Sequence, residues 1–294
     1  MQKRFRGLGV AMVTPFQEGG DVDYKSLEKL TEHLIGNGSD FLVVQGTTGE
    51  TPVLSNEEKQ KTLDFVLQIN KGRLPIVLGV GGNNTREVCK EFQTIPKGVD
   101  GILSASPHYN KPNQAGIYAH YSALAECTDL PIILYNVPGR TASNMAADTT
   151  LNLAEDFDNI IAIKEASGNL EQVSEILKYK PLGFDVLSGD DALTLPMLAL
   201  GAEGVISVVG NAFPKEFSNM IKAYFEGNMN LAQSIHFRLF DLIQALFADG
   251  NPAGIKEVLK TLNICSTHLR LPLVEVNEDL KKHLYNCLVE SQLV

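Results

Sequence analysis

Lys164 is the residue whose position is most suggestive of chemistry. It follows the apolar run at residues 159–163 (Asn-Ile-Ile-Ala-Ile) and directly precedes Glu165. A lysine on an apolar strand must keep its ammonium hydrated, find a counter-charge or release its proton, because burial disfavours the charged form. A neutral amine is the group that attacks a carbonyl carbon to form a Schiff base. The position predicts such a nucleophile. The structural alternative is a strand-end lysine that extends into solvent.

Two polar residues near a second apolar run, residues 132–136 (Ile-Ile-Leu-Tyr-Asn), have types that would assist such an amine. Tyr135 carries a phenol, which can shuttle protons during carbinolamine formation and dehydration. Arg140 lies five residues later, and its planar guanidinium is suited to binding a substrate carboxylate through two hydrogen bonds. The structural alternatives are a buried tyrosine that packs on its neighbours and an arginine in an exposed ion pair.

Glycine-rich segments follow two further apolar runs. Residues 46–50 (Gly-Thr-Thr-Gly-Glu) can direct amides and hydroxyls at a small carboxylate, although the same composition also suits a generic loop. Residues 79–82 (Gly-Val-Gly-Gly) begin as a dinucleotide loop does, but the third glycine is absent, so we expect a tight loop of the barrel. The sequence has no Walker or His-Glu-x-x-His motif, and its histidines show no ligand spacing. We therefore expect surface or interhelical histidines rather than metal ligands.

Short β-rich runs recur along the first three-quarters of the chain, and segments with helical spacing separate them. The expected strands are Gly9–Val13, Phe41–Gln45, Ile76–Val80, Gly101–Ser104, Ile132–Asn136, Ile160–Lys164, Phe184–Ser188 and Gly204–Val208. The clearest intervening helices are expected at Tyr24–Ile35, Glu57–Ile69 and Asn169–Lys178, with Ser55 and Asn84 as caps of two helix starts. Alternating strands and helices indicate parallel pairing with right-handed crossovers. Eight repeats favour a closed (β/α)₈ TIM barrel over an open doubly wound sheet.

Polar and glycine residues follow the strands at their carboxyl ends, where barrel enzymes place their active sites. From about Phe225 the strand-like runs stop, and helices are expected at Met229–Ala248, Gly254–Leu262 and Asn277–Ser291. We therefore expect a barrel domain at residues 1–224 and a helical C-terminal domain at 225–294, packed on the barrel or on a neighbouring subunit.

The composition is that of a soluble enzyme. The 294 residues are 44% hydrophobic and 20% charged, with a formal net charge of −10. This balance predicts no electrostatic footprint for nucleic acid or an anionic membrane. Four scattered cysteines without a Cys-x-x-Cys pair favour a reduced, cytoplasmic protein.

The N-terminus superficially resembles a signal peptide. Lys3, Arg4 and Arg6 precede the apolar stretch Leu8–Val13. That stretch is short, Pro15 ends it, and no small-residue cleavage site follows. No run approaches the roughly 20 apolar residues that a spanning helix needs. We expect no membrane partner.

Taken together, the motifs resemble those of a known group. The chain is similar to the pyruvate-dependent class I aldolases of the dihydrodipicolinate synthase and N-acetylneuraminate lyase superfamily over essentially its whole length. The resemblance is carried by residues 46–50, by residues 135–138 (Tyr-Asn-Val-Pro) and by residues 164–169 (Lys-Glu-Ala-Ser-Gly-Asn). Within the superfamily, Arg140 and Tyr109, in their local sequences, resemble the dihydrodipicolinate synthase branch.

The resemblance implies a specific reaction. Lys164 would condense with pyruvate, and the enamine would attack L-aspartate 4-semialdehyde. The adduct would cyclise to 4-hydroxy-tetrahydrodipicolinate, on the route to diaminopimelate and lysine. Tyr135, Thr47 and Tyr109 would form a proton relay, with Tyr109 supplied by a neighbouring subunit. Thr48 would hold the pyruvate carboxylate.

The resemblance also implies how the second substrate is held and how subunits assemble. Arg140 would bind the carboxylate of that substrate, and the backbones of Gly189 and Ile206 would border the site. The family is usually a homotetramer, a dimer of dimers, and needs no metal or organic cofactor.

Many members of the family are inhibited by lysine at a cleft between subunits, and the resemblance implies which residues correspond to it. They are Thr51, Pro52, Asn56, Lys59, Asn83, Glu87 and His108. Asn83 and Glu87 fit the lysine-binding pattern, whereas Asn56, Lys59 and His108 depart from it. A fixed ammonium at Lys59 would repel the ammonium of the effector, since like charges at close range disfavour binding. We therefore expect weak or absent feedback by lysine.

Two other functions compete with this interpretation. One is an N-acetylneuraminate or 2-keto-3-deoxy-sugar-acid aldolase that keeps the Schiff base but takes another aldehyde. Arg140 disfavours it, because those substrates need partners for hydroxyls rather than for a carboxylate. The other is a non-catalytic keto-acid-binding protein, which would not require Lys164, Tyr135 and Thr47 together. The fold alone does not decide among them.

Overall fold

The computed structural model describes residues 5–294, so Lys3 and Arg4 of the basic N-terminal group lie outside the described residues. Its eight strands form a closed parallel barrel in the order of the sequence, which confirms the predicted fold class. The strands are β1 (Gly7–Ala11), β2 (Phe41–Val44), β3 (Ile76–Gly79), β4 (Gly101–Ala105), β5 (Ile132–Asn136), β6 (Ile160–Glu165), β7 (Asp185–Ser188) and β8 (Gly204–Ser207). Each strand end lies within two residues of the position expected from the sequence.

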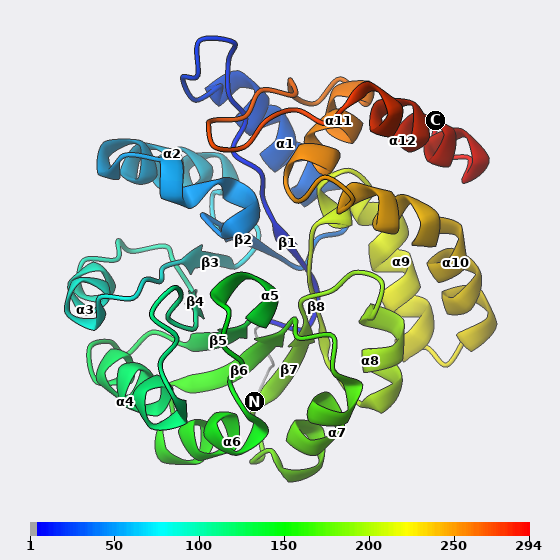
Figure 1. Cartoon of the computed structure of the whole chain (residues 1–294). Helices are drawn as coiled ribbons and strands as arrows, with labels where there is room; N and C mark the ends of the chain where they lie inside the picture. Colours follow the sequence, from blue (N-terminus) through cyan, green and yellow to red (C-terminus); the bar gives the residue numbers. More distant parts are fainter. Residues whose placement is uncertain (1–4) are drawn as a thin grey trace. The chain divides into compact units, whose positions relative to one another are not determined.

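Helices follow the strands (Figure 1). They are α1 (Tyr24–Gly36), α2 (Asn56–Asn70), α3 (Thr85–Gln93), α4 (Gln114–Ala125), α5 (Pro138–Thr141), α6 (Ala147–Asp156), α7 (Leu170–Tyr179), α8 (Thr194–Leu200), α9 (Pro214–Phe225), α10 (Met229–Leu246), α11 (Ala253–Thr261) and α12 (Glu278–Glu290). Short 3₁₀ helices occupy Thr47–Gly49, Thr51–Val53 and Val209–Asn211. The three helices expected after residue 225 are present as α10, α11 and α12.

The chain divides into two compact units. The first consists of Pro75–Ile206 with the N-terminal stretch that ends at Arg6, and the second of Gly7–Leu74 with Ser207–Val294. The expected domain boundary after residue 224 falls at the end of α9 and stays a prediction.

In the first unit, the strands from β3 to β8 pair in parallel, each with the next. Helices α4, α6 and α7 lie along the outer side of β5, β6 and β7 (Figure 1). The strands are buried on both faces, as parallel strands covered by helices must be. Consecutive strands therefore present their side chains in matched rows.

In the second unit, β1 and β2 pair in parallel, and α9 packs on β1. Helix α10 packs on α9, α11 and α12. Its buried residues Ile235, Leu239, Leu242 and Leu246 recur every three or four positions, so one apolar stripe faces these neighbours. The C-terminal helices thus pack through α10 on α9, which in turn lies against β1.

The two expected helix caps have different outcomes. Ser55 caps α2 through a reciprocal capping box with Glu58, as expected. Asn84 is the N-cap residue of α3, as expected, but its side chain makes no capping hydrogen bond. The Asn84 carbonyl instead accepts the first hydrogen bonds of the helix, from the amides of Glu87 and Val88.

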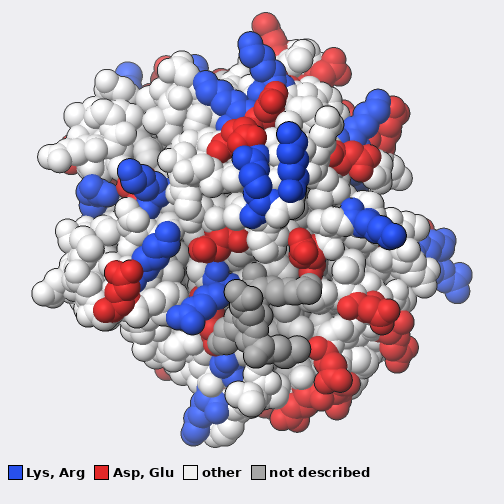
Figure 2. All heavy atoms as spheres, turned by 180° about the vertical axis from the view of Figure 1, so that it is seen from behind, with Lys and Arg blue, Asp and Glu red and all other residues white. Residues whose placement is uncertain are grey.

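The surface carries charges of both signs. On the face drawn in Figure 2, Lys and Arg side chains lie among Asp and Glu side chains rather than in one basic field. Within residues 5–294, no helix is long and apolar enough to cross a membrane. All four cysteines are free thiols.

Candidate active site

Lys164 and Tyr135 lie side by side in the first unit. Tyr135 of β5 is the register partner of Lys164 of β6, so both side chains leave the same face of the sheet. The lysine Nζ lies 4.3 Å from the centroid of the tyrosine ring. Only 5% of Lys164 and 7% of Tyr135 are exposed. The structure therefore brings together the two residues from which the sequence analysis expected amine and proton-transfer chemistry.

The next residue of each strand faces the other way. Asn136 is the register partner of Glu165, and its Nδ2 donates to both carboxylate oxygens at 3.2 and 3.0 Å. Glu165 also accepts from Gln172 Nε2 at 3.0 Å and from the amide of Ser167 at 2.6 Å. Since successive side chains of a strand point to opposite faces, this carboxylate anchors the end of β6 rather than pairing with Lys164.

Gly189 follows β7 and lies against the lysine side chain. A Cβ at this position would be 3.1 Å from Cε of Lys164 and 2.6 Å from Cβ of Ala166. The Gly189 amide donates to the carbonyl of Glu165 at 2.8 Å, which fixes the backbone in this place. Glycine is thus required because its backbone approaches the lysine closely. Ile206, in β8, is fully buried.

Arg140 and Tyr109 both have exposed side chains in segments that follow strands. Arg140 belongs to the short helix α5, which ends at the left-handed residue Ala142. Tyr109 follows β4, and 85% of it is exposed. Its φ of 70° and the φ of 48° at Lys111 are left-handed values for residues other than glycine. Such backbone is held only where the surrounding structure requires it, and it often marks functional loops.

The loop at residues 46–50 belongs to the second unit. Thr47 is exposed, whereas Thr48 is 3% exposed. Thr48 Oγ1 accepts a hydrogen bond of 2.9 Å from Nδ2 of Asn251, and the Gly49 carbonyl accepts one of 2.7 Å from the hydroxyl of Thr14. The loop is therefore held by side chains from remote parts of the sequence.

Sequence reasoning missed the residues that hold this loop. Asn251 and Lys256 come from the segment just before α11 and from α11 itself. Both are buried and both contact residues of the 46–50 loop. The available signal was the position of Lys256 on the apolar stripe of its helix. A charge that is buried there needs a partner elsewhere in the chain.

The residues of the expected lysine cleft are divided between the two units. In the second unit, Asn56 and Lys59 lie on α2, and the hydroxyl of Thr51 donates to the carbonyls of Gln45 and Gly46. Pro52 is exposed in the same segment. In the first unit, Nδ2 of Asn83 donates to the carbonyl of His108 at 3.5 Å, and Glu87 pairs with Lys90.

The histidines show no arrangement for metal binding. Within residues 5–294, no three His, Cys, Asp or Glu side chains gather as metal ligands would. His120 is buried, and Nδ1 of its ring lies 2.8 Å from the hydroxyl of Thr85. Burial lowers the pKa of His120 to about 4, so its ring is neutral near pH 7.

The chain matches proteins of one family along almost its whole length. It is 54% identical to the 4-hydroxy-tetrahydrodipicolinate synthase of Parabacteroides distasonis over 270 residues, which cover 92% of this chain and 91% of that protein. It is also 54% identical to the enzyme of the same name from Phocaeicola vulgatus, covering 93% of each chain.

Solved structures agree with these sequence matches. Dihydrodipicolinate synthase from Aquifex aeolicus superposes with a TM-score of 0.95 at 43% identity, covering 98% of this chain and 99% of that one. The dihydrodipicolinate synthase (DHDPS) of Cyanidioschyzon merolae with lysine bound superposes with a TM-score of 0.96 at 41% identity, covering 100% of both chains. The model of the Dihydrodipicolinate synthetase family matches residues 4–291. The chain therefore belongs to the dihydrodipicolinate synthetase family.

Proposed function

We propose that the protein is a 4-hydroxy-tetrahydrodipicolinate synthase, a lyase that condenses pyruvate with L-aspartate 4-semialdehyde. The observation that carries the proposal is the buried amine of Lys164 against the ring of Tyr135, in a chain that is 54% identical to enzymes of that name. A buried amine beside a phenol is suited to carbonyl condensation, because the steps before and after C–N bond formation each move a proton.

The reaction begins at Nζ of Lys164. The neutral amine attacks C2 of pyruvate, and the carbinolamine loses water to give an iminium ion. Loss of a methyl proton gives an enamine, whose carbon attacks the aldehyde carbon of the second substrate. The amino group of that substrate then attacks the iminium carbon and displaces the lysine, which closes the ring and regenerates the free amine. The net reaction releases one water.

Tyr135, which lies against the amine, is proposed to move protons there, and Thr47 and Tyr109 are proposed as the other members of the relay. The exposure of Tyr109 and its left-handed backbone support a role outside its own subunit. We propose that Tyr109 acts in the site of a neighbouring subunit and that the protein assembles as a homotetramer. Sedimentation equilibrium measures this state directly.

Carboxylate recognition is assigned to Thr48 and Arg140. The hydroxyl of Thr48 is proposed to bind the carboxylate of pyruvate, and the exposed guanidinium of Arg140 that of the semialdehyde, with which it can form two hydrogen bonds. The backbones of Gly189 and Ile206 are proposed to border the same site. Pyruvate itself is present in the structure of the Acinetobacter baumannii relative, which is 37% identical and superposes with a TM-score of 0.95.

Feedback by lysine is proposed to be weak or absent. Lys59 would place an ammonium near the ammonium of the effector, and like charges at short range oppose binding. Initial rates measured over a range of lysine concentrations test this. Half-maximal inhibition at low lysine would refute it, and a gain of inhibition in Lys59→His would support the charge argument.

The test of the function is turnover of pyruvate with L-aspartate 4-semialdehyde, coupled to NADPH oxidation by the reductase that consumes the product. Rapid NADPH loss in the wild type and none in a folded Lys164→Ala variant is the expected result. A folded wild-type enzyme without turnover would contradict the substrate assignment and favour a sugar-acid aldehyde.

A further inference from the structure

Glu50, the last residue of the glycine-rich loop, forms a fully buried ion pair. Its Oε1 lies 2.5 Å from Nζ of Lys256 in α11, and neither side chain is exposed. Glu50 also has a left-handed backbone, with a φ of 55°. A charge buried this deeply is tolerated only when its partner and further hydrogen bonds are in place. The loop and α11 are therefore tied together across 206 positions of the sequence.

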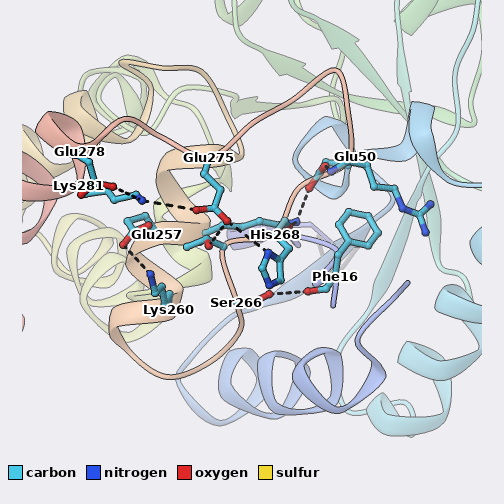
Figure 3. Close-up of polar contacts among 12 residues, drawn as sticks. Phe16, Glu50, Glu257, Lys260, Ser266, His268, Glu275, Glu278 and Lys281 are labelled. Atoms are coloured by element: carbon cyan, nitrogen blue, oxygen red, sulfur yellow. Dashed lines mark hydrogen bonds and ion pairs between the residues drawn. The ribbon is translucent and has the colours of Figure 1, made fainter. Parts of the chain in front are cut away.

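Each charge of this pair has a further partner in the segment that follows α11, and the close-up in Figure 3 shows the surroundings of Glu50 and His268. Nζ of Lys256 donates to the carbonyl of His268 at 2.8 Å and lies 4.4 Å from the ring centroid of Phe16. The amide of Arg270 donates to the other carboxylate oxygen of Glu50 at 3.1 Å. The hydroxyl of Ser266 donates to the carbonyl of Phe16 at 2.7 Å. Both charges of the pair thus have hydrogen-bond partners, and the pair fixes the position of residues 46–50 relative to residues 251–256, the segment that leads into α11 and forms its first turn.

That same segment carries Asn251, which contacts Thr48. Nδ2 of Asn251 donates to Oγ1 of Thr48 at 2.9 Å, and both residues are more than nine-tenths buried. A hydroxyl has one hydrogen to donate and two lone pairs that accept. Because Thr48 accepts from Asn251, its own hydrogen is left for a different acceptor. A carboxylate, which only accepts, is the partner that this orientation suits.

We propose that Asn251 is a positioning residue for the keto-acid site: it orients the hydroxyl of Thr48 toward the pyruvate carboxylate, and the Lys256–Glu50 pair holds the two segments together. The inference rests on the proposed function, since it assumes that Thr48 binds pyruvate. It assigns to the C-terminal helical segment a part in substrate binding. Asn251 does not touch the reacting atoms.

A purely structural role for Asn251 predicts a different result. If its amide only helped the chain to fold, a substitution would lower the melting temperature and leave the affinity of the folded enzyme for pyruvate unchanged. If it orients Thr48, the KM for pyruvate must rise while the KM for the semialdehyde changes little. The effect must also disappear when Thr48 has no hydroxyl.

The experiment is a double-mutant cycle of Asn251→Ala and Thr48→Val. The pyruvate dependence of borohydride trapping and both KM values are measured for the four proteins. Loss of one hydrogen bond that prepares a charged contact predicts a rise of about tenfold in the pyruvate KM of Asn251→Ala. In the Thr48→Val background the same change should have an effect of less than about twofold. An equal rise in both backgrounds, or no rise in the first, would overturn the proposal.

Two further variants keep the test decisive. Asn251→Asp has the same shape but accepts from Thr48, so it withdraws the hydrogen from the substrate and should weaken pyruvate binding more than Asn251→Ala does. Lys260→Met, on the exposed side of α11, serves as a matched control with unchanged kinetics. If the wild type is not trapped with pyruvate, the proposed function fails. If it is trapped and the Asn251 variants match it, only the positioning role fails.

Discussion

Lys164 and Thr48 are positioned by different means. Lys164 meets Tyr135 because the two residues are register partners on neighbouring strands of a parallel sheet. Thr48 lies in a loop, and its hydroxyl is bonded by Asn251, 203 positions later in the chain. Strand register places the amine through many backbone hydrogen bonds at once. The loop depends on a few side-chain contacts, each of which one substitution removes.

This difference predicts how each region responds to mutation. Around Lys164, changes should affect chemistry while the geometry of the strands persists. Around the 46–50 loop, changes to remote residues should affect stability and keto-acid affinity, because a buried charge that loses its partner is strongly destabilising.

The largest expected effect is that of Tyr135→Phe on turnover. The ring stays against Lys164, but the phenol oxygen that we propose moves protons is lost. General acid–base catalysis typically contributes about 10²–10⁴-fold, so kcat should fall by that factor. Steady-state kinetics measures the loss, and borohydride trapping shows that the amine remains competent. A kcat within a few-fold of the wild type would remove Tyr135 from the mechanism.

The next effect concerns the buried pair. Lys256→Met leaves the carboxylate of Glu50 buried without its counter-charge, which should lower the free energy of unfolding by about 3–5 kcal/mol. Lys260→Met on the same helix removes an exposed charge and should change it by less than about 0.5 kcal/mol. Urea unfolding compares the two. If both substitutions change the free energy of unfolding equally and only slightly, the Lys256–Glu50 pair does not hold the loop.

A smaller loss of stability is expected at the end of β6. Glu165→Gln removes the charge that accepts from Asn136, Gln172 and the Ser167 amide. Hydrogen bonds to a charged group contribute about 1.5–3 kcal/mol each, so unfolding should become easier by an amount of that order. Because this carboxylate faces away from Lys164, trapping with pyruvate should continue. Complete loss of trapping in a folded variant would show that Glu165 acts on the amine.

The smallest expected effect is a pH dependence of stability that arises from Glu58 in α2. The guanidinium of Arg270 and the amide of Ser55 lower the pKa of Glu58 from 4.5 to about 2. The pKa of Glu58 in the folded protein lies below its ordinary value. The ionised carboxylate therefore contributes its full stabilisation of the fold above pH 4.5, and this stabilisation is lost as the pH falls toward 2. Urea unfolding over this range should show less dependence on pH in Glu58→Gln. If the pH dependence of unfolding in Glu58→Gln equals that of the wild type, Glu58 is not the source of this pH dependence.

The sequence allowed prediction of the parts that depend on local pattern. The eight strands follow from short apolar runs, and parallel order alone brings the ends of β5 and β6, and so Tyr135 and Lys164, to one edge. The contacts of Asn251 and Lys256 were not predictable in this way, because no periodicity links them to residues 46–50. The position of Asn84 as the N-cap of α3 followed from residue type, but its missing side-chain hydrogen bond did not, because the side-chain conformation depends on its surroundings.

The central claim is that Lys164 forms a Schiff base with pyruvate. Borohydride reduction in the presence of pyruvate alone, followed by peptide mass spectrometry, tests it most directly. We expect irreversible inactivation, with one reduced pyruvate adduct on the peptide that contains Lys164 and none in Lys164→Ala. Unmodified Lys164 in an inactivated enzyme, or full activity after reduction with saturating pyruvate, would contradict it.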